Sequence, residues 1–413
     1  MPEPKNRRTG IALCLSGGGF RAALFHLGAL RRLNELGILS TVDTISSVSG
    51  GSIIAAHLAD RIQSWPPTGN EVSDWEKRIA QPFRDFTKKN LRTNPLLKRL
   101  LPWNLVKSQT AVESLATRYE NELTSLSLRV LPDRPRFIFC ATDMAFGVNW
   151  VFEKRRVGDY QAGYISPSPD WPVARAVAAS SCFPPVFSPL PLGLRPDQLS
   201  EGKAPPGPDR DALIENLHLT DGGVYDNMGL EPVWKKSEVV LVSDGGAVFD
   251  FRSDRGLFRL LRYPTIIGNQ SSALRKRWLL SNFILGEIEG TYWGIGSASE
   301  DYKAEASANS DKLVENVPSG YSNSLVKDKI SKVRTDLDGF SDAESAILEN
   351  HGYLLAAAAT QRYAPNLAQS TAPISPPHPG WMNEAQVEQA LARSHERSVP
   401  GRGWLSASNR RPS

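Results

Sequence analysis

Residues 10–21 read GIALCLSGGGFR, an apolar run that stops at three glycines. An apolar run of this length, bounded by glycine, is typical of a buried strand. From Phe20 to Leu36 leucines recur at helical spacing, and Gly37 predicts where this helix ends. A strand, a glycine turn and a helix in this order predict the first unit of an α/β fold.

The alternation of strand and helix patterns continues along the chain. Val42–Val48 predicts a second strand, and Ser52–Leu58 predicts the start of a second helix. Further apolar runs of strand length follow at Arg136–Ala141, Val148–Phe152 and Val239–Ser243. Strands that alternate with helices predict a mostly parallel sheet covered by helices on both faces.

The 413 residues are predicted to form one main unit followed by a tail. We expect this unit to span residues 1–363, with the motifs of its core within 10–250 and a mainly helical extension over 266–363. In residues 364–413 proline, serine and charged residues dominate. This composition predicts a tail that is poorly ordered or lies along the surface.

Composition and charge narrow the class of protein. The chain is 40% hydrophobic and 22% charged, as soluble globular proteins are, and its net charge of +4 does not favour a nucleic-acid partner. Residues 1–10 lack the apolar segment of a secretory signal, and no apolar run is long enough to span a bilayer. We therefore expect a cytoplasmic protein, with peripheral attachment to a membrane as the alternative. Cys14, Cys140 and Cys182 have no metal-ligand spacing and are expected to be free thiols, with Cys14 and Cys140 buried in strands.

Gly17, Gly18 and Gly19 lie between the first strand and its helix and predict an anion site. Glycines let successive N–H groups turn toward one point, and the helix dipole adds positive potential there. Such a site suits an oxyanion hole or a phosphate cradle. Residues 17–22 also match the dinucleotide-binding pattern G-x-G-x-x-A, with Asp43 as its acidic residue. The loop alone leaves open a hydrolase and a nucleotide-binding oxidoreductase or regulatory module.

Residues 47–51 read SVSGG and lie between the second predicted strand and the second helix. This is the strand–turn–helix context of a nucleophile elbow, in which Ser49 would have a strained backbone and small neighbours. Gly51 fits this pattern, whereas Ser47 stands where the pattern has glycine. The N–H of Gly50 would point toward a developing oxyanion, so Ser49 is the candidate nucleophile.

A serine nucleophile needs a base, and histidine is the usual one. No histidine of the chain stands in a recognisable triad context, although His218 lies near a candidate acid; the six are His26, His57, His218, His351, His378 and His395. Asp221 precedes two glycines, which predicts a tight turn that leaves its carboxylate free to approach Ser49. The same tripeptide recurs at Asp244, so the pattern leaves two candidate bases. A carboxylate has an ordinary pKa of about 4, so its surroundings must raise that pKa for it to act as a base.

Together these motifs resemble those of the bacterial-type patatin-like phospholipases. That family has a glycine-rich loop with a basic residue, a serine elbow and a distant D-G-G/A, which occur here in the same order. The segment Ala176–Pro189 (AVAASSCFPPVFSP) resembles the one that precedes the family's aspartate. The resemblance covers roughly residues 10–250 and departs at Ala22, where many relatives have glycine, and at Ser47. It implies a three-layer α/β/α fold with a mostly parallel central sheet and a helical C-terminal portion.

The resemblance also implies a function. It implies that Ser49 and Asp221 form a catalytic dyad without histidine, and it favours Asp221 over Asp244 because V-Y-D-N follows Asp221. It assigns the oxyanion hole to Gly17, Gly18, Gly19 and Gly50. The implied enzyme is a carboxylic ester hydrolase of the phospholipase A or lysophospholipase type, working through an acyl-enzyme without metal or organic cofactor. Its partner would be a phospholipid or other acyl-ester lipid, and Arg21 would bind a substrate phosphate or support the loop through an ion pair.

Two stretches combine cationic and apolar residues. Between Phe86 and Val112 there is no acidic residue, and lysines and arginines are interleaved with leucines and Trp103. Arg252–Arg277 is a second basic cluster, with Phe258, Leu260 and Leu261 among its apolar residues. Each stretch suits contact with an anionic membrane or forms a solvated basic cap, and the sequence does not decide between the two.

Overall fold

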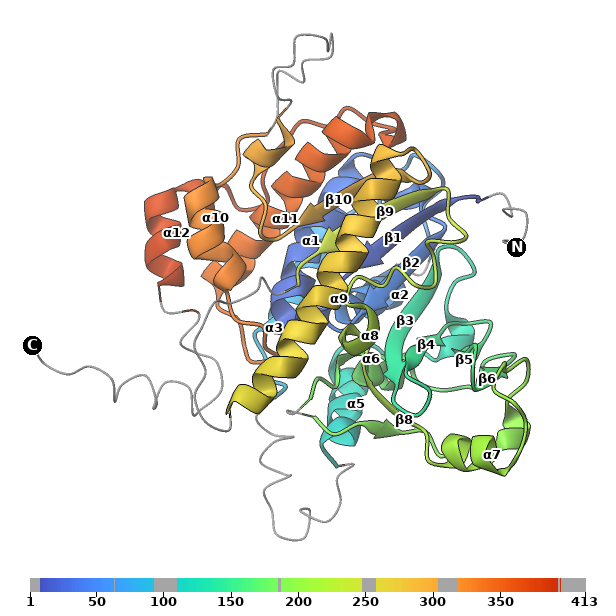
Figure 1. The fold of residues 1–413 in the computed structure, drawn as a ribbon. Helices are drawn as coiled ribbons and strands as arrows, with labels where there is room; N and C mark the ends of the chain where they lie inside the picture. The colour runs from blue at the N-terminus through green and yellow to red at the C-terminus, as the bar shows by residue number, and fades with distance from the viewer. Residues whose placement is uncertain are drawn as a thin grey trace, which may run out of the picture.

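The computed structural model describes residues 8–62, 64–92, 110–184, 187–246, 258–303, 318–392 and 394. These residues form a ten-stranded mixed sheet with helices on both of its faces (Figure 1). The predicted α/β class, with parallel strands in the centre of the sheet, is confirmed.

The described elements match the predicted ones closely at the amino-terminal end of the chain, within one or two residues at most boundaries. The strands are β1 (Ile11–Leu15), β2 (Thr44–Val48), β3 (Arg136–Asp143), β4 (Val148–Phe152), β5 (Val157–Asp159), β6 (Gly163–Ile165), β7 (Leu190–Pro191), β8 (His218–Asp221), β9 (Val239–Asp244) and β10 (Glu289–Gly294). The helices are α1 (Gly19–Glu35), α2 (Gly50–Arg61), α3 (Gln81–Thr87), α5 (Thr110–Glu122), α6 (Val173–Ser181), α7 (Pro208–Glu215), α8 (Gly223–Asp226), α9 (Phe258–Ile284), α10 (Asn323–Asp328), α11 (Asp342–Tyr363) and α12 (Glu384–Leu391).

The sheet has a parallel centre and an antiparallel extension. Strands β10, β9, β1, β2 and β3 are neighbours in this order and run parallel to one another. Beyond β3, strands β4, β5 and β6 continue the sheet with antiparallel pairs. Strand β10 lies inside the stretch 266–363, which the sequence pattern described as mainly helical. Its Gly290 allows the close pairing, because a Cβ there would collide with the carbonyl oxygen of Val240.

Alternate residues of β1 show how the two faces of the sheet are covered. Leu13 and Leu15 belong to the large core beneath helices α1, α2, α6 and α11. Ala12 and Cys14 belong to a much smaller cluster on the opposite face. That cluster is closed by α9, which crosses in front of the sheet in Figure 1, and includes Leu279 of that helix. The two faces therefore bury very different amounts of apolar surface.

The cysteine prediction is confirmed, since all three cysteines are free and buried. In residues 364–392 of the predicted tail, Ala372 and Pro373 accept hydrogen bonds from Arg32 at their carbonyl oxygens, and α12 buries Val387 and Leu391 in the large core. Residues 395–413, most of the basic stretch 86–112 (residues 93–109) and residues 252–257 lie outside the described residues. In the described part of the chain, none of the helices combines the length and the apolar composition that crossing a membrane requires.

Candidate active site

Ser49 is the residue between β2 and α2, and its backbone is strained. Its φ of 50° and ψ of −115° lie in a backbone region that residues other than glycine rarely adopt. The residue is buried, and it caps the amino end of α2. A strained serine at a strand–helix turn is the predicted elbow geometry.

The residues that follow Ser49 must be glycine because neighbouring backbone atoms occupy the space that a Cβ would need. A Cβ on Gly50 would collide with the carbonyl oxygen of Gly19, and one on Gly51 with that of Leu15. Ser47 fits where the pattern has glycine because its hydroxyl has partners. It donates to the carbonyl oxygen of Ile138 at 3.0 Å.

Strand β3 brings the nucleophile turn and Asp221 together. Strand β2 pairs with one edge of β3 as far as Val48, which lies opposite Cys140. Beyond that point, strand β8 pairs with the same edge of β3 in the antiparallel direction, and its last residue, Asp221, lies opposite Ala141. The other edge of β3 is occupied by β4. The ends of β2 and β8 therefore meet over two consecutive residues of β3.

The surroundings of Asp221 change its acid–base behaviour. Burial raises the pKa of Asp221 to about 7, against the lowering effect of hydrogen bonds from the N–H of Gly223 and from the side chain of Ser49. The bond from Gly223 reaches Oδ1 at 2.7 Å. A carboxylate that titrates near neutrality and lies next to a serine turn is suited to accept that serine's proton.

Ser180, near the end of α6, connects the two turns. Its hydroxyl accepts a hydrogen bond from the N–H of Ser49 at 2.9 Å and donates to the carbonyl oxygen of Cys140 at 2.6 Å. Its own carbonyl oxygen accepts from the N–H of Gly222 at 3.2 Å. Ser180 lies in the segment that resembles the family, but no sequence pattern assigned it a role, since its partners are 40 or more positions away.

The three-glycine loop lies directly against Ser49. A Cβ on Gly17 would be 3.1 Å from the Cβ of Ser49 and would overlap the side chain of Asn227. The N–H of Gly17 donates to the carbonyl oxygen of Asn227 at 3.0 Å, so it is not free to bind an oxyanion. Gly17 therefore provides clearance for the nucleophile instead of the hydrogen-bond donor expected from the sequence.

The remaining glycines of the expected oxyanion hole are placed differently. Gly18 and Gly19 have φ values of 143° and 60°, which glycine adopts without strain. Among the described residues, none accepts a hydrogen bond from the N–H of Gly18, Gly19 or Gly50. All three N–H groups lie at the amino end of α1 or α2, where the helix dipoles favour negative charge.

Arg21 is buried behind the loop. Its Nε and Nη2 donate to the carbonyl oxygen of Gly245 at 3.2 and 2.9 Å, and Nη1 donates to that of Val333 at 3.0 Å. Burial lowers the pKa of Arg21 to about 10, so the group stays charged at neutral pH. With its guanidinium engaged by backbone, Arg21 is placed to support the loop, and this geometry does not favour the alternative of binding a substrate phosphate.

The second D-G-G turn follows β9 and lies behind the same loop. The carboxylate of Asp244 accepts from the hydroxyl of Tyr292 at 2.8 Å and from the N–H of Gly246 at 2.9 Å. Gly245 donates to the hydroxyl of Ser16 at 2.9 Å. Both oxygens of Asp244 are thus held by partners other than Ser49.

The buried histidines form hydrogen bonds with groups other than Ser49. His26 donates from Nε2 to the carbonyl oxygen of Ser16 and accepts at Nδ1 from Ser243. Burial lowers the pKa values of His26, His57 and His351 to about 4, so these side chains are neutral. The remaining described histidines have their own contacts: His218 with the carbonyl oxygen of Asn216, and His378 with Glu349.

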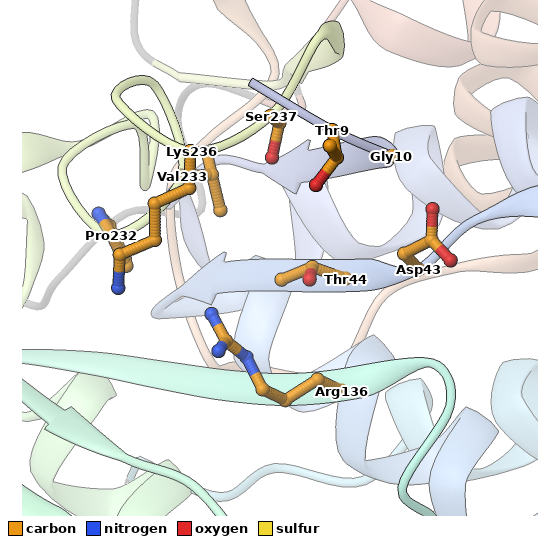
Figure 2. A pocket seen from close by; sticks show the side chains of 9 residues that line it. All are labelled: Thr9, Gly10, Asp43, Thr44, Arg136, Pro232, Val233, Lys236 and Ser237. Carbon is orange, nitrogen blue, oxygen red and sulfur yellow. The ribbon is translucent and has the colours of Figure 1, made fainter. Parts of the chain in front are cut away.

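The acid that a dinucleotide site requires lies at the wrong end of the sheet. Asp43 precedes β2 and binds Arg134 and the N–H of Ile11. The glycine loop follows the opposite, carboxyl end of β1, about 15 Å away along a five-residue strand. Asp43 instead borders a cavity of about 420 Å³ at the amino ends of the strands, with Arg136 and Lys236 on its walls (Figure 2). This separation argues against the nucleotide-binding interpretation.

A strained serine beside a buried carboxylate, on an α/β sheet with a glycine loop at its carboxyl edge, defines the nucleophile-elbow class of α/β proteins. The family model described as patatin-like phospholipase matches residues 13–234, more than half of the chain. The chain therefore belongs to the patatin-like phospholipase family.

No curated protein matches the chain significantly. Among solved structures, human GIVD cytosolic phospholipase A2 is 12% identical, with a TM-score of 0.44 over 96% of this chain and 64% of that one. VipD from Legionella pneumophila is 16% identical, with a TM-score of 0.32 over 86% of this chain and 66% of that one. This chain thus spans less than two thirds of the length of either solved chain.

Proposed function

We propose that this protein hydrolyses fatty-acyl esters of lipids, with Ser49 as nucleophile and Asp221 as base. The observation that carries the proposal is the meeting of the strained Ser49 turn and the buried Asp221 at one edge of β3, where burial raises the pKa of the acid to about 7. Membership of the patatin-like phospholipase family supports a lipid substrate. The finer assignment, a phospholipase A or lysophospholipase, belongs to the same proposal.

The mechanism follows from the placement of these groups. Asp221 takes the proton of the Ser49 hydroxyl while the oxygen attacks the ester carbonyl carbon. The N–H groups of Gly18, Gly19 and Gly50 stabilise the oxyanion of the tetrahedral intermediate. This intermediate expels the alcohol, which takes the proton from Asp221, and leaves the acyl group on Ser49.

Water completes the cycle. Asp221 accepts a proton from a water molecule, which attacks the acyl-enzyme, and a second tetrahedral intermediate releases the fatty acid. Ser49 regains its proton from Asp221. Every proton transfer in this scheme uses Asp221, so the scheme requires neither a metal ion nor an organic cofactor.

Exposed apolar side chains flank the acid turn and suit an acyl chain. Val224 directly follows Gly223 and is exposed. Phe183 is also exposed, and the residue before it, Cys182, accepts a hydrogen bond from Thr220, the neighbour of Asp221. These side chains would contact the apolar part of an ester bound at Ser49.

A fluorophosphonate probe tests the nucleophile. The wild-type protein is expected to be labelled once per chain, and Ser49→Ala to lose both labelling and ester hydrolysis, by a factor of about 10⁴ or more. Activity that persists in Ser49→Ala would overturn the assignment. The alternative, an oxidoreductase or regulatory module that binds a nucleotide at the glycine loop, instead predicts a flavin or nicotinamide absorbance in the purified protein and no labelling.

A further inference from the structure

The outward side of α9 carries a row of exposed apolar residues. Ile267 is 69% exposed, Leu274 59% and Leu285, just past the end of the helix, 74%. Trp278, at 36%, lies between them. Ile267, Leu274 and Trp278 are seven and four positions apart, which places them on one side of the helix, and Leu285 follows seven positions after Trp278. We call these four residues the α9 stripe.

The opposite side of α9 is already packed against the sheet. Leu279 is fully buried, and Phe283 packs against the same small cluster, which contains Met228 and Leu230. The stripe is therefore a second apolar side of a helix whose first apolar side is satisfied. Side chains of this size are rarely exposed together on a soluble protein unless they bind a partner.

The charge of α9 indicates the kind of partner. Residues 258–284 contain five cationic residues and no aspartate or glutamate. Arg275 pairs with Glu231 at 3.1 Å, and Lys276 lies over the ring of Tyr292 at 4.2 Å. Arg277 points to solvent. A helix that combines exposed aliphatic residues with cations and no anions is complementary to an anionic lipid surface.

An aromatic pair strengthens this complementarity. Trp278 meets Trp234 edge to face, with 4.7 Å between ring centroids, and the Nζ of Lys235 lies 4.8 Å from the ring of Trp234. Tryptophan and lysine side by side are typical of the level of lipid headgroups, because each has an apolar body and a polar end.

The stripe also lies near the candidate active site. Arg275 stacks over the ring of Tyr225 at 4.9 Å, and Tyr225 belongs to α8, the helix that directly follows Asp221 and Gly222. Figure 1 shows α9 crossing next to α8. A surface bound by the stripe would therefore lie beside the turn that contains the proposed base.

We propose that the α9 stripe docks the protein on the surface of an anionic phospholipid membrane. The apolar side chains enter the headgroup region, and Arg277 and Lys235 contact the anionic headgroups. Docking holds the Ser49 site next to its substrate. This consequence rests on the proposed lipid hydrolysis, whereas the docking itself does not.

The test uses the full chain in a Ser49→Ala background, so that vesicles are not consumed. Co-sedimentation is measured with vesicles of phosphatidylcholine alone and of phosphatidylcholine with phosphatidylserine. We expect binding to the second kind, and a loss of about tenfold or more for each of Ile267→Asp and Leu274→Asp. Arg277→Glu is expected to weaken binding to phosphatidylserine vesicles only. Val130→Asp is the matched control, since Val130 is 62% exposed and lies outside α9.

Three results would overturn the proposal. They are wild-type-like binding by the Ile267→Asp/Leu274→Asp double variant, absence of binding by the Ser49→Ala parent, and a dimer of the parent that the double variant turns into a monomer. The last result would assign the stripe to a second copy of the chain. Hydrolysis of a short-chain soluble ester, measured with Ser49 intact, is expected to be unchanged by the stripe variants. Failure to cleave that ester would contradict the proposed function without affecting the sedimentation result.

Discussion

The chain contains the tripeptide Asp-Gly-Gly twice, each time at the end of a strand, and the two copies differ in almost every contact. Asp221 is buried beside the Ser49 turn, and burial raises its pKa to about 7. Asp244 is held by Tyr292 and Gly246. The tripeptide specifies a turn, and the neighbouring strand decides what its carboxylate meets.

The difference arises from strand direction. Strand β8 runs antiparallel to β3 and ends where β2 ends, so its turn faces the nucleophile. Strand β9 runs parallel to β1, and its turn lies behind the glycine loop, where Gly245 accepts from Arg21. One turn is therefore placed to take part in the reaction, and the other supports the loop.

Among the variants of the two turns, Asp221→Asn is expected to have the largest effect. An amide cannot accept the serine proton, so kcat is expected to fall by about 10³- to 10⁴-fold. Steady-state hydrolysis of a soluble ester measures the loss, and circular dichroism checks that the fold is retained. Activity within tenfold of wild type would show that the first turn does not contain the base.

The pH dependence of hydrolysis also distinguishes Asp221 from Asp244. Because burial raises the pKa of Asp221 to about 7, the acid is protonated and inactive as a base below that pH. We expect kcat/KM to rise about tenfold per pH unit up to about pH 7 and then to level off. A profile that is flat from pH 5 to 8 would contradict the assigned base. Asp244→Asn is expected to keep the wild-type profile.

Ser180→Ala tests the connection between the elbow and the acid turn. The variant leaves the N–H of Ser49 without its acceptor, and we expect kcat to fall about tenfold, KM to change little and the free energy of unfolding to fall by about 1–3 kcal/mol. Fluorophosphonate labelling is expected to be slower but complete. Ser180→Thr keeps the hydroxyl and is expected to recover most of the rate, whereas equal losses in both variants would indicate a packing effect.

The smallest effect is expected for the second turn. Asp244→Asn keeps an oxygen that can accept from Tyr292 or Gly246, so kcat is expected to change by less than about tenfold. Tyr292→Phe removes the partner hydroxyl and is the companion variant. A loss in Asp244→Asn as large as that in Asp221→Asn would exchange the roles assigned to the two turns.

Local patterns were sufficient for the parts of the site that local geometry creates. The apolar run before Gly17 predicted β1, and the SVSGG pattern predicted the strained backbone of Ser49. Strand β8 was missed because its four residues are too few to show the alternation of apolar and polar residues that predicts a strand. Its pairing with β3 also joins segments that are far apart in the sequence. The contacts of Arg21 were missed for the same reason, since both acceptors lie more than 200 positions away.

The pairing of β2 and β8 on one edge of β3 has a consequence for how the chain tolerates change in length. Ser49 and Asp221 are 172 positions apart, yet their spacing depends on the register of Cys140 and Ala141 with their partners. Insertions in the surface segments between the two turns leave that register intact. A single deletion within β3 shifts one pairing against the other and turns side chains to the opposite face. The protein is therefore expected to tolerate changes in the length of these loops, but not a change in the length of the eight-residue strand β3.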